Sequence, residues 1–493
     1  MIRNVEPKPA PRPRVARRAL AAALAVALTA GAAASARAAV RTDQGVRPHA
    51  LRSVDPAQRR VLAAGPAAPL GREPIPVYNC NDDGVGSLRA AVASATSGDT
   101  VDAVGLHCGT ITLSSGAIAI GVDDLAILGP GPGDLDITNG AKYGRVFTHT
   151  GTGTLRLLGM TISSGVVSPN ALEADTRGGC VFSAGSLALG NALDPTDAAQ
   201  GVVVRDCAAI SNQSDVSADG GGLYAGDSLS LAATVVSGCR AVAQDGARSA
   251  HGGGVSVHGS TLSMKYSEVR DSEATGPLGF SGGVDAAFVD TVTVTHSTIA
   301  GNYASERAGG AYLGSGSGGR VSIDNTTISG NASPGESGLI VNVISGATPG
   351  RIRLASSTIS ANESPGPYGA VLLAGPTELD ATIVSGNQSE WVDLTLQSAA
   401  TATGADNLIG TYSGEPPPQG LIVSTDPGLA PLAYNGGPTR THALLPGSAA
   451  IDAGDTLFDS NTDQRGFARV VGAAADIGAY ERDPERIFAD GFD

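Results

Sequence analysis

The chain is poor in the basic side chains that polyanion-binding proteins use. It has three lysines, and its 32 basic residues are outnumbered by 47 acidic ones. Residues 1–38 carry seven of the basic residues and one acidic residue, so the remainder has 25 basic and 46 acidic residues and a formal charge of −21. Such a surface cannot supply the Lys/Arg stripe that neutralises phosphates, which argues against nucleic acid as a partner.

Aromatic residues and strong helix formers are also scarce. Aromatics make up 4% of the sequence, and Trp391 is the only tryptophan. This weakens a carbohydrate-binding interpretation, because sugar-binding grooves often use aromatic platforms. Lys and Glu are sparse, whereas 68 glycines accompany many Val, Ile, Thr and Ser residues. This composition is typical of strands and tight turns, and no strict glycine triplet suggests collagen.

The longest apolar run is too short to be a comfortable membrane span. It covers Ala19–Ala34, follows several arginines, and precedes an Ala-x-Ala site that ends at Ala38. A span needs roughly 20 residues, so a cleavable signal peptide over residues 1–38 is preferred to an N-terminal anchor. The sequence therefore predicts a secreted or outer-surface protein with no transmembrane segment after cleavage. Residues 39–76, rich in Pro, Ala and Arg, are expected to be a flexible leader.

A repeat of about 30 residues dominates the rest of the chain. Glycine pairs open short apolar runs, and their second members lie at 179, 222, 254, 283 and 310. Second runs end at asparagines of one phase, namely Asn302, Asn331, Asn362 and Asn387. One period is too small to bury its apolar face alone, but stacked periods share a core. The sequence therefore predicts an all-β fold, a right-handed parallel β-helix, with repeats over residues 166–425. A β-sandwich would not repeat turn residues in this register.

The repeated turn residues have expected roles. Glycine fits corners that need positive φ or close backbone approach. Asparagine fits a turn position that tolerates the left-handed conformation, and its amide can form a structural ladder along the stack. Residues 77–165 should form the N-terminal cap and first coils, with Ser87 capping a short helix over Leu88–Ala95.

Both ends of the chain resemble known exported proteins. The opening Gly86-Ser-Leu-Arg-Ala-Ala-Val resembles bacterial β-helix proteins related to the polymorphic outer-membrane protein repeats. Residues 426–482 resemble the choice-of-anchor Q domain. The motif residues that carry this second resemblance are Asn435, Gly436, Gly437, His442, Asp452, Asp463, Arg465, Asp476 and Glu481. The resemblance implies a pectate-lyase-like β-helix at or beyond the cell surface, without an assigned activity. Residues 483–493 form a tail.

The acidic residues of the terminal module allow two interpretations. Oxygen-rich loops suit a calcium ion. We prefer a salt-bridge and turn network in which Arg465 pairs with Asp476 or Glu481, and therefore expect no cofactor.

Five cysteines in an exported chain predict disulfides and one unpaired thiol. Cys80 and Cys108 bracket the N-terminal helix and should be bridged. Cys207 and Cys239 share the phase of the asparagines, which places them on adjacent coils about 4.8 Å apart and within bridging distance. Cys180 would then be free. A Cys180–Cys207 bridge is the alternative.

The sequence has no cluster that matches the catalytic groups of related folds. The nearest candidates, His251 and the Arg351/Arg353 pair, should lie about three coils apart, so they cannot share one reacting centre. His251 directly precedes a glycine corner and is interpreted as a turn residue. His296 shares a column with Tyr266 and Asn325, which we expect to be exposed. No catalytic or metal residue is assigned.

The preferred function is a non-catalytic extracellular scaffold, with an adhesin as one form. Its ligand would be an unknown glycan or surface component. The alternative is a glycan-active enzyme, either a polysaccharide lyase or a hydrolase. A cluster of carboxylates with Arg or His in one groove would favour the enzyme, and an even, uncharged groove would favour the scaffold.

Overall fold

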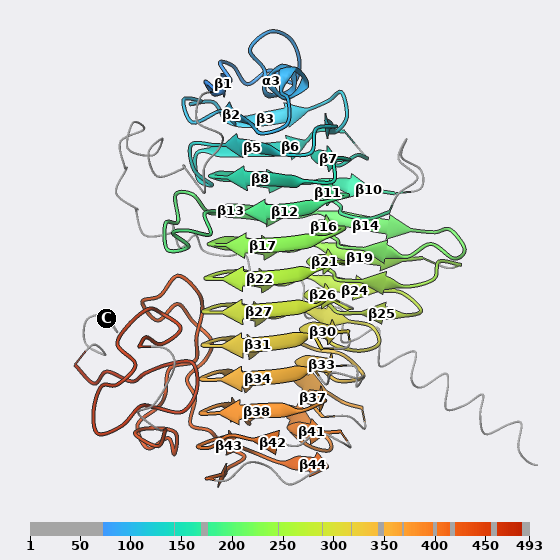
Figure 1. The fold of residues 1–493 in the computed structure, drawn as a ribbon. Coiled ribbons are helices and arrows are strands. Elements are labelled where there is room, and N and C mark those ends of the chain that lie inside the picture. Colours follow the sequence, from blue (N-terminus) through green and yellow to red (C-terminus); the bar gives the residue numbers. More distant parts are fainter. Residues whose placement is uncertain are drawn as a thin grey trace, which may run out of the picture. The chain divides into compact units, whose positions relative to one another are not determined.

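The computed structural model describes residues 72–485 except 142, 169–175, 245, 288, 317, 344–349, 367–368, 398–401, 415–419 and 455–460. The expected signal peptide, most of the leader and residues 486–493 of the tail lie outside these ranges. Within them the chain is a right-handed parallel β-helix, as predicted, and its strands stack coil upon coil (Figure 1). No helix of the described residues is both long and apolar enough to cross a bilayer.

Three long sheets, here called A, B and C, form the faces of the solenoid. Sheet A contains β1 (Ile75–Pro76), β2 (Asp99–Asp102), β5 (Leu125–Leu128), β8 (Thr154–Leu158), β12 (Ser186–Leu189), β17 (Ser228–Ala232), β22 (Thr261–Lys265), β27 (Thr291–Thr295), β31 (Arg320–Asp324), β34 (Arg351–Ala355), β38 (Thr377–Asp380) and β42 (Ala402–Thr403). Sheet B contains β3 (Gly109–Leu113), β6 (Leu135–Asn139), β9 (Met160–Ser163), β13 (Val202–Arg205), β18 (Thr234–Ser237), β23 (Glu268–Arg270), β28 (Thr298–Ala300), β32 (Thr327–Ser329), β35 (Thr358–Ser360), β39 (Ile383–Val384), β43 (Leu408–Ile409) and β45 (Ile422–Val423). Sheet C contains β4 (Ile118–Ile120), β7 (Phe147–His149), β11 (Val181–Ser183), β16 (Leu223–Ala225), β21 (Val255–Val257), β26 (Val284–Ala286), β30 (Ala311–Ser315), β33 (Leu339–Val343), β37 (Val371–Ala374), β41 (Leu394–Leu396) and β44 (Tyr412–Gly414).

Shorter sheets lie between B and C in several coils. Sheet D contains β10 (Val166–Val167), β14 (Ala208–Ser211), β19 (Arg240–Ala243), β24 (Glu273–Thr275) and β29 (Tyr303–Ala304). Sheet E contains β15 (Ala218–Asp219), β20 (Ala250–His251) and β25 (Gly279–Phe280). A separate pair contains β36 (Glu363–Ser364) and β40 (Gln388–Ser389). A coil that has all of them therefore runs through sheets A, B, D, E and C in turn.

The core consists of apolar columns that run along the solenoid. In sheet A, Leu262, Val292 and Val321 occupy the same register on successive strands, and each is at most 1% exposed. Neighbouring strands of a sheet lie about 4.8 Å apart, so each of these side chains packs on the next. Because a single coil contributes few apolar residues, the buried surface that stabilises the fold comes from this stacking.

The glycine corners behave as the sequence predicted. Gly252 has a φ of +60°, where a side chain would strain the backbone. A Cβ atom on Gly253 would lie 2.3 Å from the carbonyl oxygen of Gly282 in the next coil. The corner therefore requires glycine for two reasons, positive φ and close backbone approach.

The asparagine column forms a continuous chain of amide hydrogen bonds. The side-chain nitrogens of Asn302, Asn331 and Asn362 each donate to the side-chain oxygen of the next asparagine at 2.9 Å, and Asn387 donates to Asp393 at 2.9 Å. The asparagine itself was expected to adopt the left-handed conformation. The structure places that conformation one residue earlier, as at Gly330, whose φ is +65°.

The N-terminal cap contains helix α3 (Leu88–Ser94), and the Ser87 hydroxyl oxygen accepts a hydrogen bond from the Ala90 amide at 3.1 Å. The helix buries Leu88, Ala91 and Val92. A disulfide joins Cys80 to Cys108 in this region, across a Cα separation of 6.3 Å.

The expected Cys207–Cys239 bridge is corrected by the structure, which joins Cys180 to Cys207 with Cα atoms 5.5 Å apart. Cys239 is buried and unpaired. The reason is the register of sheet C, in which Cys180 occupies the corner position of Gly222 in the next coil. A Cβ on Gly222 would lie 3.0 Å from the Cys239 sulfur, so this corner faces the column residue of its own coil. The Cys180 side chain therefore reaches Cys207.

Candidate functional site

Two columns of side chains run along sheet C, and the C-terminal part of each column lines a groove. The first column contains the outward-facing residues at the middle of the sheet C strands, namely Phe182, Tyr224, Ser256, Asp285, Tyr312, Ile340, Leu372 and Thr395. The second column precedes the glycine corners and contains Arg177, Asp219, His251, Phe280 and Arg307. Regular stacking therefore brings polar residues from separate coils into one place.

An acid–imidazole pair joins the two columns, with Asp285 buried and His251 half-buried. The His251 Nδ1 lies 3.3 Å from the Asp285 Oδ2, and the Asp285 side chain is 3% exposed. The other ring nitrogen of His251 lies 2.8 Å from the Ser249 hydroxyl oxygen. The Phe280 ring stacks on the imidazole at 5.4 Å between centroids. Both nitrogens and one face of the His251 ring are therefore held in place.

Several polar atoms beside this pair are left without partners. The Asp219 Oδ1, the Ser256 hydroxyl and the Asp285 Oδ1 are buried and have no hydrogen-bond partner among the described residues. Asp219 pairs in register with His251 on the neighbouring strand, and Ser256 pairs with Asp285. An unsatisfied buried polar group costs about 1–3 kcal/mol, so these atoms are suited to receive hydrogen bonds from a ligand.

Burial and neighbouring charges shift the protonation of this cluster. Burial raises the pKa of Asp219, with a smaller contribution from the negative charge of Asp285, and nearby His251 opposes the shift. Burial by itself would lower the pKa of His251, but the hydrogen bond to Asp285 and the charges of Asp285 and Asp219 outweigh it and raise that pKa. The cluster thus combines a carboxyl group and an imidazole whose pKa values are both raised above their ordinary values.

Aromatic rings and an arginine extend the columns toward the N-terminal coils. Phe182 and Tyr224 stack at 5.5 Å between ring centroids. The Arg177 guanidinium lies 4.7 Å from the Tyr224 ring centroid and donates to the Tyr224 hydroxyl at 3.0 Å. His258 lies 5.5 Å from the same ring. Both aromatic rings are buried and Arg177 lies over them, so this region is a packed stack.

Toward the C-terminal coils the columns border a groove of about 660 Å³. His251 and Asp285 lie at its N-terminal end, and Trp391 and Thr395 line it further along. The Trp391 side chain is 64% exposed, which leaves its ring free to contact a ligand. Arg307 and Glu336, joined by a 2.9 Å ion pair, add a charged contact to the wall.

The sequence interpretation of His251 missed this site. Arg351 and Arg353 lie on β34 of sheet A, so the structure does not bring them to His251 on sheet E. The sequence does contain a signal for the second column, because Asp219 and His251 each precede a run of three glycines. Asp285 follows its glycine pair instead, and its contact with His251 depends on how adjacent corners pack.

The expected exposed column of Tyr266, His296 and Asn325 is also corrected. Asn325 is 1% exposed, and Tyr266 and His296 are half-buried beneath the C-terminal segment. The Thr439 hydroxyl donates to the His296 carbonyl oxygen at 3.0 Å. All three residues have positive φ, between +46° and +51°. No signal in the sequence places the terminal module over this column, so its burial is not predictable from the repeat alone.

The terminal module packs against sheet B (Figure 1). The fully buried Gln464 accepts a hydrogen bond from the Thr327 hydroxyl at 2.7 Å and donates to the Thr298 hydroxyl at 3.1 Å. His442 contacts the Ser329 hydroxyl at 2.7 Å. Glu268 is fully buried between Arg270 and Arg440, 3.6 and 3.4 Å away. These contacts explain why the outward face of this part of sheet B is buried.

Inside the module, the expected partner of Arg465 is corrected. Arg465 pairs with Asp463 at 2.7 Å, and it reaches only the backbone carbonyl of Glu481, at 2.6 Å. The carboxylates of Asp476 and Glu481 instead accept hydrogen bonds from backbone N–H groups of the same module. Arg465 also stacks on Tyr480, with its guanidinium carbon 3.7 Å from the ring centroid.

The remaining motif residues of the module form turns. Asp452 accepts the amides of Ala473 and Ala474. Asn435 donates to the Thr441 carbonyl at 2.9 Å, Gly436 has a φ of +88°, and a Cβ on Gly437 would lie 2.7 Å from Arg465. Among the described residues no group of three His, Cys, Asp or Glu side chains is arranged to hold a metal ion.

Comparison with known proteins gives one structural likeness. The chain is similar to a solved structure titled "Crystal structure of pectate lyase Pel9A", with a TM-score of 0.45 and 16% identity, over 84% of this chain and 98% of that one. No protein-family model and no curated protein sequence matches the chain. The resemblances to the choice-of-anchor Q domain and to the polymorphic outer-membrane protein repeats therefore stay predictions.

Proposed function

We propose that the protein is an extracellular glycan-active enzyme that binds a linear glycan along sheet C and hydrolyses it. The observation that carries the proposal is the His251–Asp285 pair beside Asp219, because each acid has one buried carboxylate oxygen without a hydrogen-bond partner among the described residues. A cluster of carboxylates with a histidine in one groove is the feature that favours an enzyme over a scaffold. The signal peptide expected over residues 1–38 and the two disulfides support an extracellular location.

Hydrolysis of a glycosidic bond needs a carboxylic acid and a carboxylate. Asp219, whose pKa is raised by burial, is suited to donate its proton to the glycosidic oxygen as the C–O bond breaks. Asp285 is suited to take a proton from the water whose oxygen bonds to the anomeric carbon. His251 would position Asp285 through their 3.3 Å contact. One water is consumed for each bond cleaved.

The groove offers contacts for sugar units on the C-terminal side of the cluster. Trp391 and Tyr312 present rings, and Arg307 and Glu336 present donors and acceptors. Sugar rings stack on aromatic faces while their hydroxyl groups bond polar side chains. Because these residues come from different coils, the bound polymer would run along the solenoid axis.

Release of reducing ends from a panel of neutral and acidic polysaccharides tests the proposal. The secreted chain should cleave at least one polymer, and Asp285→Asn should lower the rate about 100-fold or more. Asp83→Asn is the matched control, because Asp83 is exposed in the N-terminal cap, and it should keep the full rate.

A second candidate is the non-catalytic scaffold, in which the groove binds a glycan without cleaving it, as in an adhesin. It is favoured by one observation, that His251 and Asp285 line the groove whereas Asp219 is not among its lining residues. Retention of a polymer by the wild-type chain with no new reducing ends would support this candidate and contradict the enzyme.

A further inference from the structure

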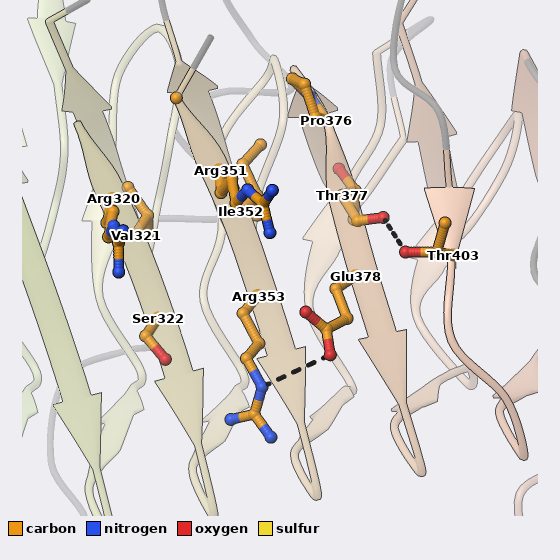
Figure 2. A pocket seen from close by; sticks show the side chains of 11 residues that line it. Arg320, Val321, Ser322, Arg351, Ile352, Arg353, Pro376, Thr377, Glu378 and Thr403 are labelled. Atoms are coloured by element: carbon orange, nitrogen blue, oxygen red, sulfur yellow. Dashed lines mark hydrogen bonds and ion pairs between the residues drawn. The ribbon is translucent and has the colours of Figure 1, made fainter. Parts of the chain in front are cut away.

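A second pocket, of about 520 Å³, lies on sheet A and is lined by arginines. Arg320 starts β31, and Arg351 and Arg353 lie on β34. Figure 2 shows these side chains projecting from the two neighbouring strands, with Glu378 on the next strand β38. The pocket therefore concentrates positive charge on one face of a strongly acidic chain.

Arg320 and Arg351 face each other directly across two parallel strands. They are register partners, and both side chains are exposed. Strands of one sheet lie about 4.8 Å apart, and like charges at this spacing repel each other. A bound anion would remove this repulsion.

The fold itself does not require arginine at these positions. The same column is occupied by Ser228, Thr261 and Thr291 in the preceding coils. Serine and threonine are therefore compatible with the strand at this position, and arginine replaces them in the two coils that form the pocket. The arginines are therefore better explained by a ligand than by the solenoid.

The nearby carboxylates are committed to the third arginine. Arg353 pairs with Asp324 and lies 3.9 Å from Glu378 (Figure 2). Within the described part of the chain, neither Arg320 nor Arg351 belongs to an ion pair. Their guanidinium groups keep their N–H donors for a ligand.

We infer that Arg320 and Arg351 form a binding site for a single oxyanionic group, a carboxylate, a sulfate or a phosphate, carried by an extracellular solute. Guanidinium forks match the paired oxygens of such groups better than an ammonium does. The net acidity of the chain limits the site to one anionic group at a time, because a long polyanion would meet repulsion beyond the pocket. The site lies on sheet A and does not depend on the groove of sheet C.

Calorimetric titration of the full chain tests the inference with four probes that share a similar sugar body. Glucuronate, glucose 6-sulfate and glucose 6-phosphate distinguish the carboxylate, sulfate and phosphate sources, and glucose is the neutral control. At least one anionic probe should bind saturably, and glucose should not. Arg320→Gln and Arg351→Gln should each weaken that binding by about tenfold or more.

Arg156→Gln is the matched variant. Arg156 is also exposed on sheet A, but its register partners are Ala126 and Ala188, so it has the same charge without a stacked arginine. It should bind the anion like the wild type. Absence of saturable binding for all three anions, equal binding of glucose, or an equal loss in Arg156→Gln would overturn the inference. Circular dichroism should show unchanged folding in the three exposed-site variants.

Discussion

Asn331 lies in the middle of the amide column that runs through the later coils. Its side-chain nitrogen donates to the Asn362 side-chain oxygen at 2.9 Å and to the Ile299 carbonyl at 3.0 Å, and its side-chain oxygen accepts from Asn302. The residue is fully buried, so each of these groups has exchanged water for a protein partner. The stability of the corner therefore depends on a complete set of hydrogen bonds.

Replacing Asn331 by leucine keeps the side-chain size but leaves these partners unsatisfied. The free energy of unfolding should fall by about 1–3 kcal/mol, measured by urea titration. Asn212→Leu is the control, because Asn212 is exposed beside β14, and it should change the free energy by less than about 0.5 kcal/mol. Equal midpoints for the two variants would contradict the ladder.

Cys239 provides a test of the disulfide pattern. It is fully buried, and burial raises the pKa of its thiol to about 12. An aromatic disulfide reagent should therefore find almost no reactive thiol in the folded protein and one per chain in denaturant. Peptide mapping that recovers Cys207 joined to Cys239 would contradict the Cys180–Cys207 pairing.

At the scale of elements, the terminal module covers part of sheet B, and we expect the contact between them to depend on pH. Burial, with nearby Lys265 and Arg469, lowers the pKa of His296 to about 4, although Asp463 opposes the shift. Its imidazole nitrogen lies 3.4 Å from the Thr462 hydroxyl of the module. The neutral ring therefore belongs to the folded, docked form.

Because the unfolded chain binds a proton at His296 near pH 6.5 and the folded chain only near pH 4, stability should be lost as the pH falls between these values. Allowing for the partial exposure of His296, its protonation should lower the free energy of unfolding by about 1 kcal/mol at pH 5 relative to pH 7. The His296→Asn variant should lack this pH-dependent loss of stability, and Asn325 shows that asparagine tolerates the positive φ of this column. Urea titrations at pH 7 and pH 5 measure the difference in the free energy of unfolding.

His107→Asn is the control for the pH experiment, because His107 is exposed in the N-terminal cap. Its stability should fall between pH 7 and pH 5 as much as that of the wild type. An identical fall in the His296 variant would show that other groups cause it.

At the scale of the whole molecule, the stacking of the coils could be predicted because the same turn residues recur in successive repeats. Glycines at 253 and 282 and asparagines at 331 and 362 recur at one phase, so one coil predicts the next. The functional cluster is different, since Asp285 and His251 meet only where two columns of different phase pack together. A sequence read one column at a time does not contain that contact.

The cover over sheet B was unpredictable for a related reason. Gln464 reaches Thr298 and Thr327 from more than 130 positions along the chain, and no repeat links them. The same applies to Cys180, whose bridge followed from the register of sheet C rather than from spacing.

A glycan is proposed to occupy the groove between His251 and Trp391, and the single tryptophan of the chain allows this binding to be tested directly. The Asp285→Asn variant, titrated with oligosaccharides from the panel, should show a saturable change in tryptophan emission, because the exposed Trp391 ring lines the groove. Saturable binding measured by calorimetry with unchanged tryptophan emission would place the glycan elsewhere and contradict the account.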